Sequence, residues 1–79
     1  MVMSFTSWLF EQIDDLGDHE KFARICWSDV NNGCAHARFS AKDWTEHFNS
    51  KHKETADKLD GLLIEAYLSY MSFVKTNLQ

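Results

Sequence analysis

Proline is absent from this sequence, and only three of its 79 residues are glycine. Both residues interrupt helix interiors, so their scarcity is compatible with long helices joined by short connections. The alternation of apolar and polar residues that marks half-buried strands is also missing. The sequence therefore predicts an all-α protein.

Disulfides, a secretion signal and a membrane span are not predicted either. Two cysteines, Cys26 and Cys34, are too few for a disulfide framework and are typical of free thiols in a reducing compartment. Residues 1–10 contain no lysine or arginine, so the charged start of a signal peptide is missing. The longest apolar run, residues 62–71, contains Glu65 and is far shorter than a bilayer span. We expect a cytoplasmic protein that does not enter a membrane.

Positive charge is lacking at one end of the chain. The first 20 residues contain five acidic and no basic residues, while the net charge of the whole chain is −4. An acidic end repels phosphate and favours basic partners, although physiological salt screens its field beyond about 8 Å. The length predicts a single domain over residues 1–79, and an aromatic content of 14% gives it large side chains for a core.

Apolar residues are abundant near the C-terminus. They recur at the spacing of an amphipathic helix, at positions 59, 62, 63, 66, 67, 70, 73 and 74. A second apolar strip, Ile64, Leu68 and Met71, lies beside the first. A helix with so much apolar surface must be covered by its own chain or by a partner. We predict that this long C-terminal helix packs centrally against the rest of the molecule.

Three shorter helical segments precede it, and each has a start signal. Ser4, Asp18 and Ser40 are the expected N-caps, and Ser40 with Asp43 resembles a capping box. Gly33 follows the second segment and suits the left-handed conformation that ends many helices. The second segment is expected to bury the stripe Phe22, Ile25, Cys26 and Val30. In the first segment Phe5, Trp8, Leu9, Ile13 and Leu16 share one face, and in the third segment one face carries Trp44, His47, Phe48 and Lys51. The predicted fold is a compact bundle of four helices.

Several of these residues occur in a recognisable order. They are Phe5-x-x-Trp8-Leu9, Asp15-x-Gly17-Asp18, Phe22-Ala23-Arg24, Asp29, Ala66-Tyr67 and Tyr70. This order resembles the YozE-like family, small bacterial and phage proteins with a fold similar to the sterile alpha motif. The resemblance covers roughly residues 4–74 and implies a compact SAM-like helical bundle. It implies no catalytic residues, because the family has no established activity to carry over.

No metal or cofactor site is predicted. Zinc sites usually place cysteine pairs two to four residues apart, whereas Cys26 and Cys34 are eight apart, and His36 adds an isolated imidazole. His47 and His52 are five residues apart, a spacing that zinc sites use. If both are helical, however, they point roughly 140° away from each other. We expect a core thiol and surface imidazoles instead.

Calcium binding and catalysis are not predicted either. Asp14, Asp15, Asp18 and Glu20 lack the alternating spacing of a calcium loop, and a helix end followed by an N-cap explains them. No serine or cysteine lies in a glycine-rich nucleophile turn, and no phosphate-binding glycine motif occurs. We expect a protein that is not an enzyme.

Two binding functions remain. A nucleic-acid-binding accessory protein would use Lys42, Lys51, Lys53 and Lys58, but acidic residues interrupt these lysines and the net charge opposes phosphate binding. We favour a protein-binding module, with a homodimer as one form of it. The expected contacts are the apolar Phe10, Trp27, Leu68 and Met71, with Asp14, Asp15 and Asp18 as an acidic rim for a basic partner. A phage-encoded inhibitor of a host system, such as an anti-CRISPR protein, is a specific version of this hypothesis.

Overall fold

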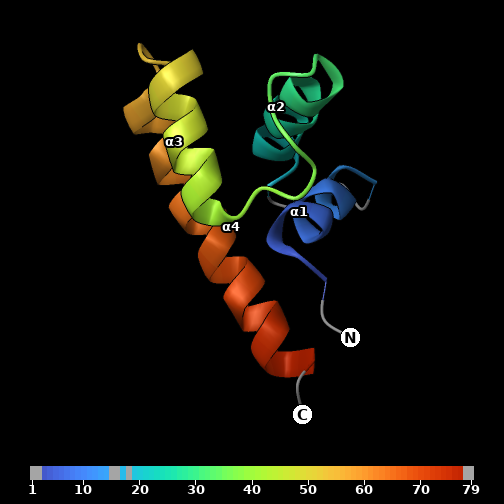
Figure 1. Ribbon diagram of the computed structural model, residues 1–79. Coiled ribbons are helices and arrows are strands. Elements are labelled where there is room, and N and C mark those ends of the chain that lie inside the picture. The colour runs from blue at the N-terminus through green and yellow to red at the C-terminus, as the bar shows by residue number, and fades with distance from the viewer. Residues whose placement is uncertain (1–2, 15–16, 18, 78–79) are drawn as a thin grey trace.

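The computed structural model describes residues 3–14, 17 and 19–77, which form four helices and no strand (Figure 1). The helices are α1 (Phe5–Asp14), α2 (Glu20–Asn31), α3 (Ala41–Lys51) and α4 (Ala56–Asn77). With 22 residues, α4 is the longest of them and accounts for the elongated outline of 39 × 22 × 21 Å. The predicted all-α bundle of four helices is confirmed.

The C-terminal helix α4 contacts each of the other three helices. It lies side by side with α3, antiparallel to it, and α1 and α2 form a second packed pair beside them (Figure 1). Leu59, Leu63 and Ala66 of α4 are buried in the core, as the apolar spacing predicted. Among the described residues, no helix combines the length and the apolar character needed to cross a membrane.

Aromatic side chains from several helices fill the core. Trp44 and Phe48 of α3 are fully buried, and Phe22 of α2 packs edge-on against Phe48 with ring centroids 5.8 Å apart. Phe5 of α1 packs edge-on against Tyr70 of α4 at 5.5 Å. Edge-to-face pairs of this kind stabilise a fold beyond the area that they bury. The bundle is therefore held together without a disulfide among its described residues.

Two helix ends follow the predicted chemistry. Ser40 and Asp43 form a capping box, in which the Asp43 N–H donates to Ser40 Oγ at 3.2 Å and the Ser40 N–H donates to Asp43 Oδ2 at 3.0 Å. Hydrogen bonding to Ser40, first to its backbone N–H and then to its side chain, lowers the pKa of the Asp43 carboxyl below its ordinary value. Gly33 has a φ of +79°, which is the left-handed conformation expected after α2.

Other details differ from the predictions. Ile25, expected in the buried face of α2, is 37% exposed because it lies at the edge of the interface with α4, while its neighbour Cys26 is fully buried. Thr6, which was not expected in the core, is fully buried. The N-cap of α2 is His19, and the predicted cap Asp18 lies outside the described residues.

Candidate functional site

A groove of about 490 Å³ lies between α1 and α2. Its lining residues are Phe10, Ile13 and Asp14 from α1 and Arg24, Trp27 and Ser28 from α2. Phe10 and Ile13 are partly buried and pack against the core, whereas 48% of Trp27 is exposed. The groove therefore has an apolar base that is continuous with the core and an accessible aromatic wall.

The lining of the groove carries one acidic side chain, Asp14, and one basic side chain, Arg24. Asp14 is exposed at the C-terminal end of α1, where the helix dipole also places partial negative charge and where no basic residue occurs in the last turn. The guanidinium of Arg24 is paired with Glu20, with 2.6 Å between Arg24 Nε and Glu20 Oε2. Asp14 is the carboxylate of the lining and has no basic neighbour in its own turn, whereas the charge of Arg24 is already paired with Glu20.

The structure places the predicted contact residues on two surfaces. Phe10, Asp14 and Trp27 come together in the groove. Leu68 and Met71 are 64% and 43% exposed on α4, a helix that contributes no residue to the groove. The remaining rim residues of the hypothesis, Asp15 and Asp18, lie outside the described residues.

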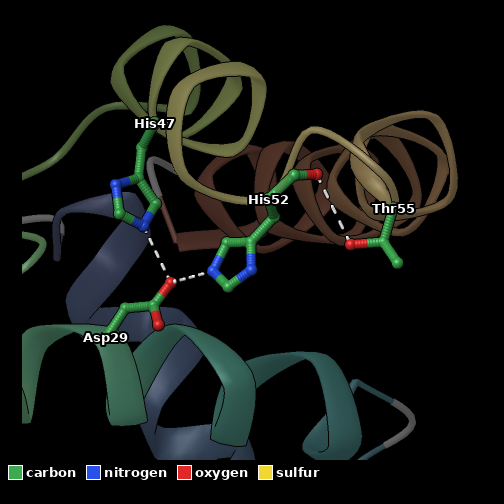
Figure 2. Close-up of polar contacts among 4 residues, drawn as sticks. All are labelled: Asp29, His47, His52 and Thr55. Carbon is green, nitrogen blue, oxygen red and sulfur yellow. Dashed lines mark hydrogen bonds and ion pairs between the residues drawn. The ribbon is translucent and has the colours of Figure 1, made fainter.

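A second site, made of polar side chains, lies where α2 and α3 end (Figure 2). Asp29, His47 and His52 converge there, and both imidazoles point at the same carboxylate oxygen. The distance from Asp29 Oδ2 is 2.7 Å to His47 Nε2 and 2.8 Å to His52 Nε2. An ionised carboxylate only accepts hydrogen bonds, so each Nε2 carries the proton in this arrangement.

The local structure explains this convergence. Asp29 lies in the last turn of α2, and its carbonyl accepts hydrogen bonds from the N–H groups of Cys34 and Ala35 at 2.9 and 3.2 Å. These bonds fold the chain back after Gly33 and hold the backbone of Asp29. His47 projects from the last half of α3 toward it.

His52 reaches the cluster because it is not helical. It is the C-cap of α3, with φ −127° and ψ 50°, and its ring lies 5.8 Å from that of His47. The expectation that these two histidines point apart is therefore wrong, since it required both residues to be helical. The hydroxyl of Thr55 donates to the His52 carbonyl at 3.5 Å and supports the turn (Figure 2).

The cluster is mostly enclosed. The side chain of His47 is 5% exposed, that of Asp29 is 13% exposed and that of His52 is 33% exposed. A carboxylate in the last turn of a helix opposes the helix dipole, and α2 has no basic residue in its last turn. An acid at this helix end, with no basic residue near it in the sequence, is a signal that could have indicated a distant partner for Asp29, but the sequence analysis did not use it.

The cysteines and the remaining histidine of the zinc hypothesis do not join this cluster. Cys26 is fully buried, and its burial, with a smaller contribution from the charge of Asp29, raises the pKa of its thiol far above the ordinary range. Cys34 and His36 are exposed. Among the described residues, the group whose ligand atoms approach closely enough to share an ion is Asp29, His47 and His52, with all three atoms within 4.8 Å.

Comparisons with known proteins do not add to this geometry. No family model, no curated protein and no solved structure matches the chain. The resemblance to the YozE-like family thus stays a prediction, and function is inferred from the sites themselves.

Proposed function

We propose that this protein is a non-enzymatic protein-binding module and that the groove between α1 and α2 is its binding site. The expected ligand is a segment of a partner protein that presents one large apolar side chain next to a lysine or arginine. The observation that carries the proposal is the position of Trp27, which is 48% exposed beside the partly buried Phe10 and the exposed carboxylate of Asp14.

The apolar part of the groove supplies the expected affinity. Tryptophan is enriched among the residues that dominate binding energy, and such residues act best next to a well-packed base. Phe10 and Ile13 provide that base because they pack against the core, and so the groove is already formed before a ligand binds. A volume of about 490 Å³ is enough for one or two large side chains.

The charge at the rim supplies the expected selectivity. The first 20 residues of the chain contain no basic residue, and Asp14 lies at the negative end of α1. A basic side chain beside the apolar anchor would therefore be attracted, and an acidic one repelled. An inhibitor of a host complex with a basic nucleic-acid channel, an anti-CRISPR protein included, is one form that this proposal takes.

Selection of peptides from a random display library tests this proposal directly. We expect the selected peptides to share an aromatic or aliphatic anchor followed by lysine or arginine. Trp27→Ala should weaken their binding by about 2 kcal/mol or more, and Asp14→Lys should weaken it further at low salt. The matched control is Ile64→Ala, which removes an exposed apolar side chain of α4 outside the groove. Peptides without a basic residue, or peptides that bind Trp27→Ala as tightly as the unaltered protein, would contradict the proposal.

The exposed strip on α4 favours self-association as a second form of protein binding. Ile64, Leu68 and Met71 are 60%, 64% and 43% exposed, although they share a helix with core residues. Light scattering across a concentration series would detect a dimer as a mass above 9.2 kDa. Leu68→Lys should return such a dimer to the monomeric mass, because it places a charge in the apolar contact.

Nucleic-acid binding remains the competing hypothesis. Lys51 and Lys53 lie at the turn between α3 and α4, whereas Lys42 lies in the first turn of α3 and Lys58 in the first turn of α4. A gel shift at physiological salt separates the two hypotheses. Robust binding of DNA or RNA that is lost on reversing these lysines would replace the protein-binding proposal.

A further inference from the structure

We propose that Asp29, His47 and His52 form a binding site for a divalent transition-metal ion, with Zn²⁺ as the expected occupant. This inference does not depend on the groove between α1 and α2, which none of the three residues lines. It rests on the convergence of two imidazole Nε2 atoms on one carboxylate oxygen (Figure 2).

The donor set matches the chemistry of zinc. Two imidazole nitrogens and one carboxylate oxygen form a recurrent set of three protein ligands for Zn²⁺ and for related first-row metals. The same set is poorly suited to Ca²⁺ and Mg²⁺, which prefer oxygen ligands. The three ligand atoms lie within 4.8 Å of one another, so a single ion can reach them all.

Two of the three separations between ligand atoms need only a small adjustment to hold an ion, while the two imidazole nitrogens, which lie within 4.8 Å of each other, must take up the same spacing. Ligands about 2.05 Å from a tetrahedral zinc lie about 3.3 Å from one another, roughly half an ångström more than the present N···O contacts. Those contacts are 2.7 and 2.8 Å because hydrogen bonds currently join the three residues. His52 can supply the movement, since it lies beyond the end of α3 and its side chain is 33% exposed.

Metal binding replaces the hydrogen bonds among these three residues with bonds from each of them to the ion. In the hydrogen-bonded arrangement each Nε2 carries a proton and donates it to Asp29 Oδ2. A neutral imidazole that coordinates a metal through Nε2 must carry its proton on Nδ1 instead. The ion therefore replaces two hydrogen bonds to Asp29, and its charge offsets a carboxylate that lies at the unfavourable end of α2.

Aromatic neighbours hold the ring of His47 in place, whereas the side of the cluster at His52 is accessible to solvent. The ring of His47 lies against Phe39, Trp44 and Phe48, with centroid distances of 5.9, 5.6 and 5.7 Å, so its orientation is fixed before an ion binds. His52 also lines a surface hollow formed by residues 50–55, and its side chain is 33% exposed, so an ion can reach this ligand from solvent. Three protein ligands leave one tetrahedral position for water.

A titration with Zn²⁺ alone tests the proposal. The protein should carry Cys34→Ser, because an exposed thiol also binds zinc. We expect one Zn²⁺ to bind per chain at neutral pH, with a rise in the melting temperature that grows with the free zinc concentration. Co²⁺ should give the visible absorption of a four-coordinate site. Absence of saturable binding would overturn the proposal.

Single substitutions assign the site to its residues. Asp29→Asn and His52→Ala should each weaken zinc binding at least about tenfold, since each removes a ligand and even outer-shell changes cost about that much. Both residues are partly exposed, and circular dichroism shows whether the variants still fold. His36→Gln is the matched control, because it alters an exposed histidine outside the cluster. Equal binding by Asp29→Asn and the unaltered chain would overturn the proposal, as would loss of binding in the folded His36→Gln variant.

Nitrogen NMR of the imidazoles distinguishes coordination from a purely structural cluster. Without metal, His47 and His52 should show protonated Nε2 atoms. With Zn²⁺, both should change to the tautomer with the proton on Nδ1, while His36 stays unchanged. Spectra of His47 and His52 that do not respond to Zn²⁺ would show that the cluster only joins the ends of α2 and α3, and would overturn the proposal.

Discussion

The indole of Trp44 donates a hydrogen bond of 2.8 Å to the hydroxyl of Thr6, a residue 38 positions away in the chain. The same hydroxyl donates to the carbonyl of Phe39 at 2.6 Å. Thr6 and Trp44 are both fully buried, so water cannot replace either bond. Thr6 on α1 therefore provides the hydrogen-bond partner both for the indole N–H of Trp44 on α3 and for the carbonyl of Phe39, which lies in the connection before α3.

Thr6→Val should lower the free energy of unfolding by about 2 kcal/mol. The substitution keeps the shape but leaves the Trp44 N–H and the Phe39 carbonyl without their partner, and each buried unsatisfied group is costly. Urea denaturation followed by tryptophan fluorescence measures this loss. Thr6→Ser is the control, because it keeps the hydroxyl and should lose only about 1 kcal/mol for the methyl group. A larger loss for serine than for valine would contradict the role assigned to the hydrogen bonds.

Gly33→Ala should destabilise the fold, whereas Gly61→Ala should not. Gly33 has a φ of +79°, where an alanine side chain costs about 1 kcal/mol or more, although nothing lies within 4 Å of the added carbon. Gly61 lies inside α4 with open space around it, so alanine should raise stability there by about 0.5–1 kcal/mol. Thermal melts of the two variants should shift in opposite directions.

The capping box should make the free energy of unfolding depend on pH in the acidic range. The pKa of the Asp43 carboxyl is lowered in the folded protein, mainly because it accepts a hydrogen bond from the backbone N–H of Ser40. This contribution is therefore fully present above the carboxyl's unfolded pKa, near pH 4, and is lost as the pH falls through the lower folded value. Carboxyl NMR titration measures the shift directly. Asp43→Asn should remove this part of the acid dependence, and an unshifted Asp43 would contradict the assignment.

The two thiols should react very differently. Cys26 is fully buried, and burial raises its pKa, so little reactive thiolate forms at neutral or mildly alkaline pH. Cys34 is exposed. A colorimetric thiol reagent at pH 8 should therefore modify Cys34 quickly in the folded protein and should reach Cys26 only after denaturant is added. Rapid labelling of both thiols in the native state would show that the core around Cys26 opens.

Local patterns were sufficient to predict much of this fold. The spacing of Leu59, Leu63 and Ala66 identified the buried face of α4, because a helix long enough to show several turns displays its period clearly. The cap at Ser40 and the left-handed Gly33 were also predicted, since both depend on residues only a few positions apart.

Contacts between distant residues could not be predicted in the same way. Thr6 was missed because its partner Trp44 lies on another helix, and a hydroxyl is not expected in a core without such a partner. The cluster at Asp29 depends on partners 18 and 23 residues away, and on the end of α3 falling at Lys51. A helix that continued through His52 would have turned that imidazole away, and helix boundaries are the least certain part of a sequence-based prediction.

The hydroxyl of Tyr70 donates to the carbonyl of Met3 at 2.6 Å, which places the start of the described chain beside the second half of α4. Both ends of the described part of the chain, near Met3 and Asn77, lie on the same side of the molecule (Figure 1). The turn that carries His52 is at the opposite end of α4, about 20 Å along the helix axis from Tyr70 and about 30 Å from Asn77. A fluorophore or surface anchor attached at either terminus would therefore lie far from His47 and His52, so immobilised protein is suited to the zinc titrations.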